Sequence, residues 1–221
     1  MAGKMIFFDS REEWLLNRKR GLGGSDIAAV IGKNPWMSNV ELWEYKTGRA
    51  EQPDIGEKPF VRYGHCAEEH IRGLFALDHP EYVVHYHDWN SWSNENYSWA
   101  VASLDGWITE ADTRRFGVFE SKTTEILRST DWEKWDGGVP QTYFCQVLFY
   151  MAVTEADFAD LRAAIKYTAK EGDKRTTIRD YHIERSDPGI EESIAYLMEQ
   201  GRKFWELVEK DERPSLILPD I

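Results

Sequence analysis

Cysteine is scarce in this chain of 221 residues, which contains only Cys66 and Cys145. Two thiols are too few for a disulfide framework, a four-thiolate zinc site or an iron–sulfur cluster. We therefore expect a protein of the reducing cytoplasm. Hydrophobic residues make up 42% of the sequence, with 10 Trp, 10 Tyr and 10 Phe, so the chain has enough apolar material for a packed core.

Long apolar runs are also missing. No run approaches the ~20 residues that a membrane span needs. The opening residues, MAGKMIFFDSREEW, turn acidic within the first ten or so positions, unlike a secretory signal. We expect neither export by a signal of this kind nor a membrane partner.

Positive charge is in deficit, with 27 Lys and Arg against 39 Asp and Glu and a formal net charge of −12. This balance argues against a generic basic nucleic-acid coat, because nonspecific affinity for DNA comes from Lys and Arg that neutralise phosphates. It leaves room for a DNA enzyme with a local basic groove, or for one whose acidic residues hold metal ions.

The order of predicted elements indicates an α/β fold, with a mixed central sheet flanked by helices. Helices are predicted at 38–48, 63–77, 140–153 and 188–210, and strands at 82–87, 97–103, 106–110, 116–123, 161–168 and 177–184. The polar segment 49–59, broken by Pro and Gly, reads as a loop. We expect one domain over 1–221, with an N-terminal helical part at 1–50 and a core at 60–221.

The stretch RKRGLGGSDIAAVIGKNPW at 18–36 joins a basic run to a glycine-rich turn. It is not a nucleotide-binding P-loop, because Ile27 stands where that motif has its first glycine and Asn34 where it has a hydroxyl. Ser25 or Asp26 is a good N-cap, and the helix that follows would present unpaired N–H groups beside the basic run. The stretch is either a pocket for a phosphate or carboxylate, or an ordinary capped helix.

One acidic residue on the predicted helix 63–77 needs a partner. At ~100° per residue, Glu68 falls on the edge of the apolar stripe, whereas Glu69 points nearly opposite to it. The stripe consists of Gly64, Ala67, Ile71, Leu74 and Phe75. Because a carboxylate on a core-facing edge is costly unless something pairs with it, Glu68 requires a cation, a metal ion or a backbone donor.

Further acidic residues follow on the strands. In FESK, Glu120 and Lys122 are two apart and project from one face of the strand. A carboxylate that binds a divalent ion, beside an amine that orients or deprotonates water, suits a hydrolytic site, although a simple ion pair has the same pattern. Asp105 in ASLDGW lies between predicted strands, where Asp-Gly is also a favoured hairpin turn. With Glu68, these residues match the requirements of a magnesium-dependent phosphodiesterase.

The predicted helix 140–153 carries Gln146 among the apolar residues of one stripe. This amide is either a hydrogen-bonded core glutamine or a group that contacts the water or phosphate of the site. A zinc site drawn from the histidines is the weaker hypothesis, because no pair has a recognised zinc spacing. The histidines considered are His65 and His70, which flank Cys66, and His85 and His87.

Several motifs together resemble a known family. They are RGLGGSDIAAVIGKNPW, YGHCAEEHIRGLF, ASLDG, FESK and YFCQVLFYM, in this order. This arrangement is similar to that of the YqaJ-type viral recombinase and phage lambda exonuclease family, within the PD-(D/E)xK nuclease superfamily. The resemblance covers 14–153, and the C-terminal third adds only a compatible pattern of elements. It implies a restriction-endonuclease-like core.

The resemblance implies a role for each matching residue of the acidic cluster. Asp105 and Glu120 match the metal-binding carboxylates, Glu68 the helix glutamate near the metals, Lys122 the catalytic lysine and Gln146 the active-site glutamine. Leu104 replaces the proline of the superfamily's name, a common departure.

The glycine-rich stretch also receives a role from the resemblance. Arg18 and Ser25 match the residues that receive a DNA 5′-phosphate, with Arg20 as a rival to Arg18. Tyr143 is expected to contact the DNA.

The function implied by the resemblance is 5′-to-3′ degradation of one strand of double-stranded DNA from its end. The reaction would use two Mg²⁺ ions about 4 Å apart, with Mn²⁺ also suitable, and would leave a 3′ single strand for an annealing protein. A ring-shaped trimer and a phage or prophage origin in a bacterial host are implied as well. An endonuclease of the same fold and a noncatalytic DNA-end-binding module are the alternatives.

Overall fold

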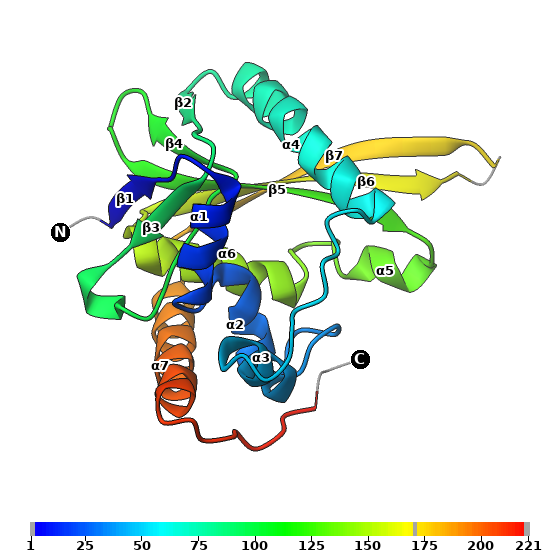
Figure 1. The fold of residues 1–221 in the computed structure, drawn as a ribbon. Coiled ribbons are helices and arrows are strands. Elements are labelled where there is room, and N and C mark those ends of the chain that lie inside the picture. The colour runs from blue at the N-terminus through cyan, green and yellow to red at the C-terminus, as the bar shows by residue number, and fades with distance from the viewer. Residues whose placement is uncertain (1–2, 170–171, 219–221) are drawn as a thin grey trace.

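The computed structural model describes residues 3–169 and 172–218 of the chain (Figure 1). In chain order the elements are β1 (Lys4–Phe7), α1 (Arg11–Lys19), α2 (Gly24–Val30), α3 (Asn39–Lys46), α4 (Pro59–Asp78), β2 (Tyr82–His85), β3 (Asn90–Ser93), the 3₁₀ turn η1 (Glu95–Tyr97), β4 (Gly106–Glu110), β5 (Phe116–Ile126), α5 (Ser129–Glu133), α6 (Gln141–Thr154), β6 (Phe158–Thr168), β7 (Lys174–Glu184) and α7 (Ile190–Glu209). None of the described helices is long and apolar enough to cross a membrane.

The main sheet has five strands in the order β2-β4-β5-β6-β7. All neighbours are antiparallel except β5 and β6, which run parallel and are joined through α6. A parallel pair needs such a crossover because a tight turn cannot bring the chain back to the same end. The first eight residues of β6 are all buried, as expected for a strand that is covered on both faces.

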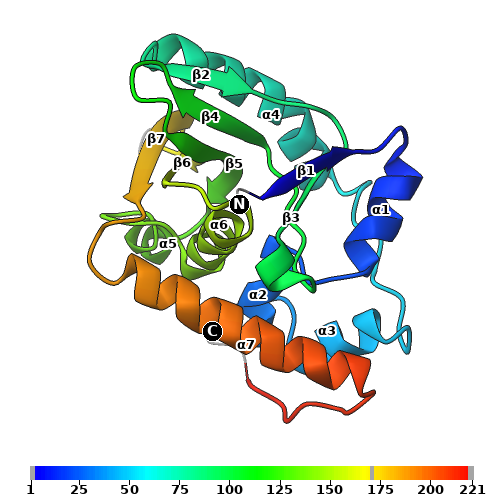
Figure 2. The same ribbon diagram turned by 90° about the vertical axis from the view of Figure 1, so that its left-hand side faces the viewer.

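Helices cover both faces of this sheet. Figures 1 and 2 show α4 on one face and α6, backed by α2 and α7, on the other. Under α4 the core is formed by Ile71 and Phe75 of the helix with Phe119 and Phe158 of the strands. The larger core lies on the α6 face and includes Val118, Leu148, Phe149, Leu161, Ile165 and Leu197. The mixed α/β fold expected from the sequence is confirmed.

The predicted strand at 97–103 is wrong. Its alternating pattern belongs to an extended segment in which Ala100 and Ala102 are buried but form only isolated bridges, to Leu22 and Trp92 respectively. The segment follows the 3₁₀ turn η1 and has no continuous neighbour, so it does not become a strand of either sheet.

The predicted helix 63–77 corresponds to α4 but begins earlier, at Pro59, a residue favoured in the first helical turn. One member of its predicted apolar stripe is misplaced, because Leu74 is 50% exposed while Ile71 and Phe75 are buried. The sheet covers only the part of the stripe nearest these two residues.

Candidate active site

The site is positioned by a gap at one edge of β5. Gly106, the first residue of β4, pairs with Phe119, so β5 beyond this point is paired only with β6. Asp105 occupies the gap, where its Oδ2 accepts hydrogen bonds from the backbone N–H of Ser121 at 3.0 Å and from the Ser121 hydroxyl at 2.9 Å. The carboxylate is therefore fixed beside the open edge of β5.

Glu120 and Lys122 lie on one face of β5, as the strand period predicts. Lys122 Nζ is 2.5 Å from Glu120 Oε1, and the Glu120 side chain is almost completely buried. Burial raises the pKa of Glu120 to about 8, and the nearby charge of Asp105 adds to this effect. Burial alone would lower the pKa of Lys122, but the Glu120 and Asp105 carboxylates raise it above its usual range.

Glu68 approaches the same carboxylates from α4. Its side chain is 28% exposed and lies 3.2 Å from Nδ1 of His65. Burial and the charge of Asp105 raise the pKa of Glu68 to about 8, while Lys122 and Arg72 oppose the shift. The helix edge thus carries Glu68 into the repulsive field of Asp105, and His65 is the side-chain partner that the structure gives it.

Gln146 of α6 joins the carboxylate and the lysine. Its Nε2 donates to Glu120 Oε1 at 2.8 Å and to the Tyr150 hydroxyl at 3.0 Å, and its Oε1 accepts from Lys122 Nζ at 3.2 Å. Tyr143, one turn earlier, places its ring 4.9 Å from the Lys122 ammonium. Gln146 is therefore both a hydrogen-bonded core glutamine and a member of the site.

The acidic residues lie near enough to one another to raise the pKa of Glu68 and of Glu120. Their side chains do not, however, converge on one point as the ligands of a metal ion do. Across residues 3–169 and 172–218, no three Asp, Glu, His or Cys side chains converge closely enough to hold a metal ion. The zinc hypothesis therefore finds no support in the structure.

The donor set nevertheless fits a hard divalent ion. Glu120 Oε2 is buried without a hydrogen-bond partner, and the oxygen donors around it are those that Mg²⁺ and Mn²⁺ prefer. Burial together with the mutual repulsion of the carboxylates raises the pKa of both Glu120 and Glu68, and a bound cation would relieve that repulsion.

The glycine-rich turn brings two predicted phosphate ligands together. A Cβ atom built on Gly23 would lie 3.6 Å from Asp26 Oδ2, 4.0 Å from Arg18 Nη2 and 4.0 Å from Ser25 Oγ, so the guanidinium and the hydroxyl lie near one point together with this carboxylate. Ser25 is exposed although its neighbours on both sides are buried. Arg20 is the exposed C-cap residue of α1.

The N-cap expected at Ser25 or Asp26 is wrong. The helix α2 begins at Gly24 with Gly23 as its N-cap, and Asp26 lies at the third helical position. From there Asp26 Oδ2 accepts the backbone N–H of Gly23 at 2.9 Å. The glycines allow the helix to start earlier than the side chains alone suggested.

Sequence reasoning missed Lys46 of α3, whose ammonium contacts the glycine-rich turn. Its Nζ lies 2.8 Å from Asp26 Oδ2 and donates to the carbonyl of Gly21 at 2.8 Å, and the side chains of Lys46 and Asp26 are each 12% exposed. The sequence offered one signal, a lysine in the last turn of a capped helix. Its partners are about 20 residues away along the chain and could not be identified from spacing.

Tyr150 connects the turn to the acidic cluster. A Cβ atom on Gly24 would lie 2.3 Å from Cε1 of Tyr150, so only glycine permits this approach. The hydroxyl of the same buried tyrosine accepts from Gln146. The turn with Arg18 and Ser25 is therefore packed directly against the network that contains Lys122.

The sequence is similar to a known protein family. Residues 13–157 match the profile described as YqaJ-like viral recombinase domain. The "Uncharacterized protein YqaJ" of Bacillus subtilis (strain 168) is 28% identical over 214 residues, covering 89% of this chain and 56% of the relative. The chain thus spans about half the length of the curated relative that it matches.

Solved structures show the same fold. An alkaline exonuclease (LHK-Exo) from Laribacter hongkongensis aligns with a TM-score of 0.57 at 21% identity, covering 90% of this chain and 97% of the other. A phage related exonuclease from Haemophilus somnus 129PT aligns with a TM-score of 0.56 at 12% identity, covering 86% and 96% respectively. The expected restriction-endonuclease-like fold class is confirmed.

Proposed function

The chain belongs to the family of YqaJ-like viral recombinase domains, and from this premise we propose that it is a divalent-metal-dependent exonuclease. It degrades one strand of linear double-stranded DNA in the 5′-to-3′ direction and leaves a 3′ single strand for an annealing protein. The observation that carries the proposal is the network of Glu120, Lys122 and Gln146 beside Asp105 at the open edge of β5. The exonuclease relatives of similar fold support this choice of reaction.

In this proposal Asp105, Glu120 and Glu68 hold Mg²⁺ or Mn²⁺. When bound, the metal supplies positive charge that activates water and stabilises the phosphodiester as it is cleaved. Lys122 orients the attacking water and stabilises negative charge on the phosphate, because its ammonium is held at the site by Glu120 and Gln146. Gln146 keeps that ammonium and the Glu120 carboxylate in a fixed relation.

Recognition of the DNA end is assigned to Arg18 and Ser25. A guanidinium and a hydroxyl that lie near one point suit a terminal phosphate, which accepts charge-assisted hydrogen bonds. The half-buried Arg18 is supported by the ring of Trp14, 4.6 Å from its guanidinium carbon. In this proposal Tyr143, whose ring lies 4.9 Å from the Lys122 ammonium, contacts the DNA strand near the reacting phosphate.

The test is magnesium-dependent release of nucleotides from three substrates: a linear duplex with 5′-phosphate ends, the same duplex with 5′-hydroxyl ends, and a covalently closed circle. We expect digestion that prefers the phosphorylated ends and spares the circle. Cleavage of the circle would indicate an endonuclease. End binding without release, in the presence of magnesium or manganese, would indicate a noncatalytic DNA-end-binding module.

The assignment of the site is tested with Lys122→Ala. This variant should lose cleavage while keeping its fold and its binding to DNA ends. The matched control is Lys203→Ala on α7, where the lysine is 57% exposed and pairs with Glu199 at 3.3 Å, and it should cleave like the parent. Turnover retained in Lys122→Ala would refute the site.

A further inference from the structure

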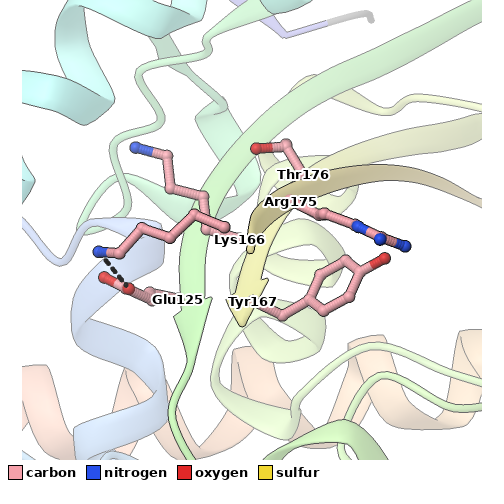
Figure 3. Close-up of a pocket in the computed structure, with 6 residues that line it drawn as sticks. Glu125, Lys166, Tyr167, Arg175 and Thr176 are labelled. Carbon is pink, nitrogen blue, oxygen red and sulfur yellow. Dashed lines mark hydrogen bonds and ion pairs between the residues drawn. The ribbon is translucent and has the colours of Figure 1, made fainter. Parts of the chain in front are cut away.

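A cationic surface lies on the β6–β7 hairpin, away from the acidic cluster. Figure 1 shows this hairpin extending beyond the body of the molecule. A shallow cavity of about 220 Å³ opens on it, and Figure 3 shows the side chains that line it. They are Glu125, Lys166, Tyr167, Lys174, Arg175 and Thr176. Two lysines thus lie on the same face as one carboxylate, in a chain whose formal net charge is −12. Tyr167 and Arg175, which are register partners, project from the other face (Figure 3).

We propose that Lys166 and Lys174 bind backbone phosphates of the DNA substrate beside the proposed active site. This inference rests on the proposed function and locates a contact surface that the acidic site lacks. A DNA enzyme needs local positive charge, because affinity for DNA comes mainly from cations that neutralise phosphates.

The register of the strands places these lysines on the α4 face of the sheet. Glu125 lies three residues beyond Lys122 on β5, so the two side chains project from opposite faces. Lys166 is the register partner of Glu125 on β6, and Thr176 is the partner of Lys166 on β7, so Lys166 shares the face of Glu125. The surface is therefore connected to the acidic cluster through α4, whose Glu68 lies in the field of Asp105.

The N-terminal part of helix α4 borders the same surface. Gly64 of α4 faces Thr123 of β5, where a Cβ on the glycine would be 3.4 Å from the threonine hydroxyl. One residue earlier, the ring of Tyr63 lies 3.1 Å from Lys166 Nζ. Tyr63 is 45% exposed and Phe60 66% exposed, and aromatic rings beside cations are typical of surfaces that follow a nucleic-acid strand.

The pairing of Lys174 leaves it available to a phosphate. Its Nζ is 3.4 Å from Glu125 Oε1, but the two side chains are 82% and 45% exposed. Such exposed pairs contribute little free energy, so a phosphate can replace the carboxylate.

Protection of a sheet edge is the ordinary explanation for lysines on strands. It applies to β7, which is the edge strand, and so to Lys174. It does not apply to Lys166, because β6 is paired on both sides. The ring of Tyr63 instead holds the ammonium of Lys166 on the surface that α4 shares with the hairpin.

The experiment measures binding of a 5′-phosphorylated linear duplex between 50 and 200 mM salt, using Lys122→Ala as the parent so that the DNA stays intact. The slope of log K against log salt should become shallower by ~1.8 in Lys166→Gln/Lys174→Gln and by ~0.9 in Lys174→Gln alone. The affinity deficit of the double variant should therefore be about tenfold larger at 50 mM than at 200 mM. The control is Lys203→Gln/Lys210→Gln on α7, which removes the same charge and should leave the slope unchanged.

The outcomes separate this inference from the proposed function. An unchanged slope in the double variant, with wild-type protein degrading the duplex, overturns the hairpin contact alone. A parent that does not bind duplex, with wild-type protein that releases no nucleotides, overturns both proposals. Equal slope losses in the hairpin and α7 variants would show a general effect of charge and also overturn the inference.

Discussion

Lys46 gives the sharpest test of how the glycine-rich turn is held. Lys46→Met keeps the length of the side chain but removes the ammonium that contacts Asp26 and Gly21. Asp26 would then be a carboxylate with 12% exposure whose remaining hydrogen bond is the one from the Gly23 N–H. Removing one partner of a buried ion pair costs about 3–5 kcal/mol, a large part of the 5–15 kcal/mol by which a typical domain is stable.

The assay is urea unfolding of four proteins: wild type, Lys46→Met, Asp26→Asn and the double variant. We expect the double variant to lose clearly less than the sum of the single losses, with an interaction free energy of about 1.5–3 kcal/mol. The control is Arg49→Met, which breaks a pair with Asp211 whose side chains are 43% and 62% exposed, and which should cost at most about 1 kcal/mol.

The same variant also tests the role of the turn. If the turn presents Arg18 and Ser25 to a 5′-phosphate, Lys46→Met should reduce the preference for phosphorylated over hydroxyl ends in the protein that remains folded. A loss of stability no larger than that of Arg49→Met, with additive single losses, would refute the argument.

Three further changes test the connection between the turn and the cluster, and the pH dependence of the fold. Gly24→Ala should cost about 1–3 kcal/mol in urea unfolding, because the new methyl group would overlap the ring of Tyr150, and an unchanged midpoint would contradict this packing. Tyr150→Phe removes the hydroxyl that accepts from Gln146, so turnover should fall about five- to tenfold with KM for DNA ends unchanged; a change confined to KM would contradict it. The hydrogen bond to Asp160 raises the pKa of His182 to about 9. The contribution of this interaction to the stability of the fold is therefore complete below pH ~6.5 and is lost as the pH rises through about 9. The stability advantage of wild type over His182→Gln should therefore shrink between pH 6.5 and 10, and a constant difference would count against the assignment.

The sequence predicted well those features that depend on neighbouring residues. The capping box of α3, with Ser38 and Glu41, is present, and β4 has the predicted bounds of 106–110. The placement of Glu120 and Lys122 on one face follows from the strand period alone. Local pattern failed for β1 and β3, which are four-residue strands that form a separate two-stranded sheet and carry no clear alternation.

The site could be predicted as a set of residues but not as a network. Gln146 stood out as an amide among apolar residues, yet its bond to Glu120 joins segments 26 residues apart and depends on the crossover from β5 to β6. Lys46 gave only the weak signal of a lysine in the last turn of a capped helix, because its importance comes from a turn that lies on another element. Such contacts are set by tertiary packing, which sequence spacing does not encode.

The position of Asp105 shows how the fold produces the site. The side-chain amide of Asn90 on β3 satisfies both backbone groups of Leu104, as a neighbouring strand would. It accepts the Leu104 N–H at 2.9 Å and donates to the Leu104 carbonyl at 2.9 Å. Arg72 of α4 then donates to the carbonyl of Asp105 at 2.7 Å. Gly106 follows, where a Cβ would lie 3.1 Å from the His85 carbonyl, so β4 can begin only after Asp105 has left the sheet.

The gap and its carboxylate therefore have a common cause. Because β4 begins at Gly106, β5 keeps an open edge at Ser121, and the N–H that a longer β4 would have paired is given to Asp105 instead. A longer β4 would fill the space that Glu68 of α4 faces and would shield Glu120 from any ligand. The late start of β4 is what brings carboxylates from a loop, a strand and a helix near one open edge of the sheet.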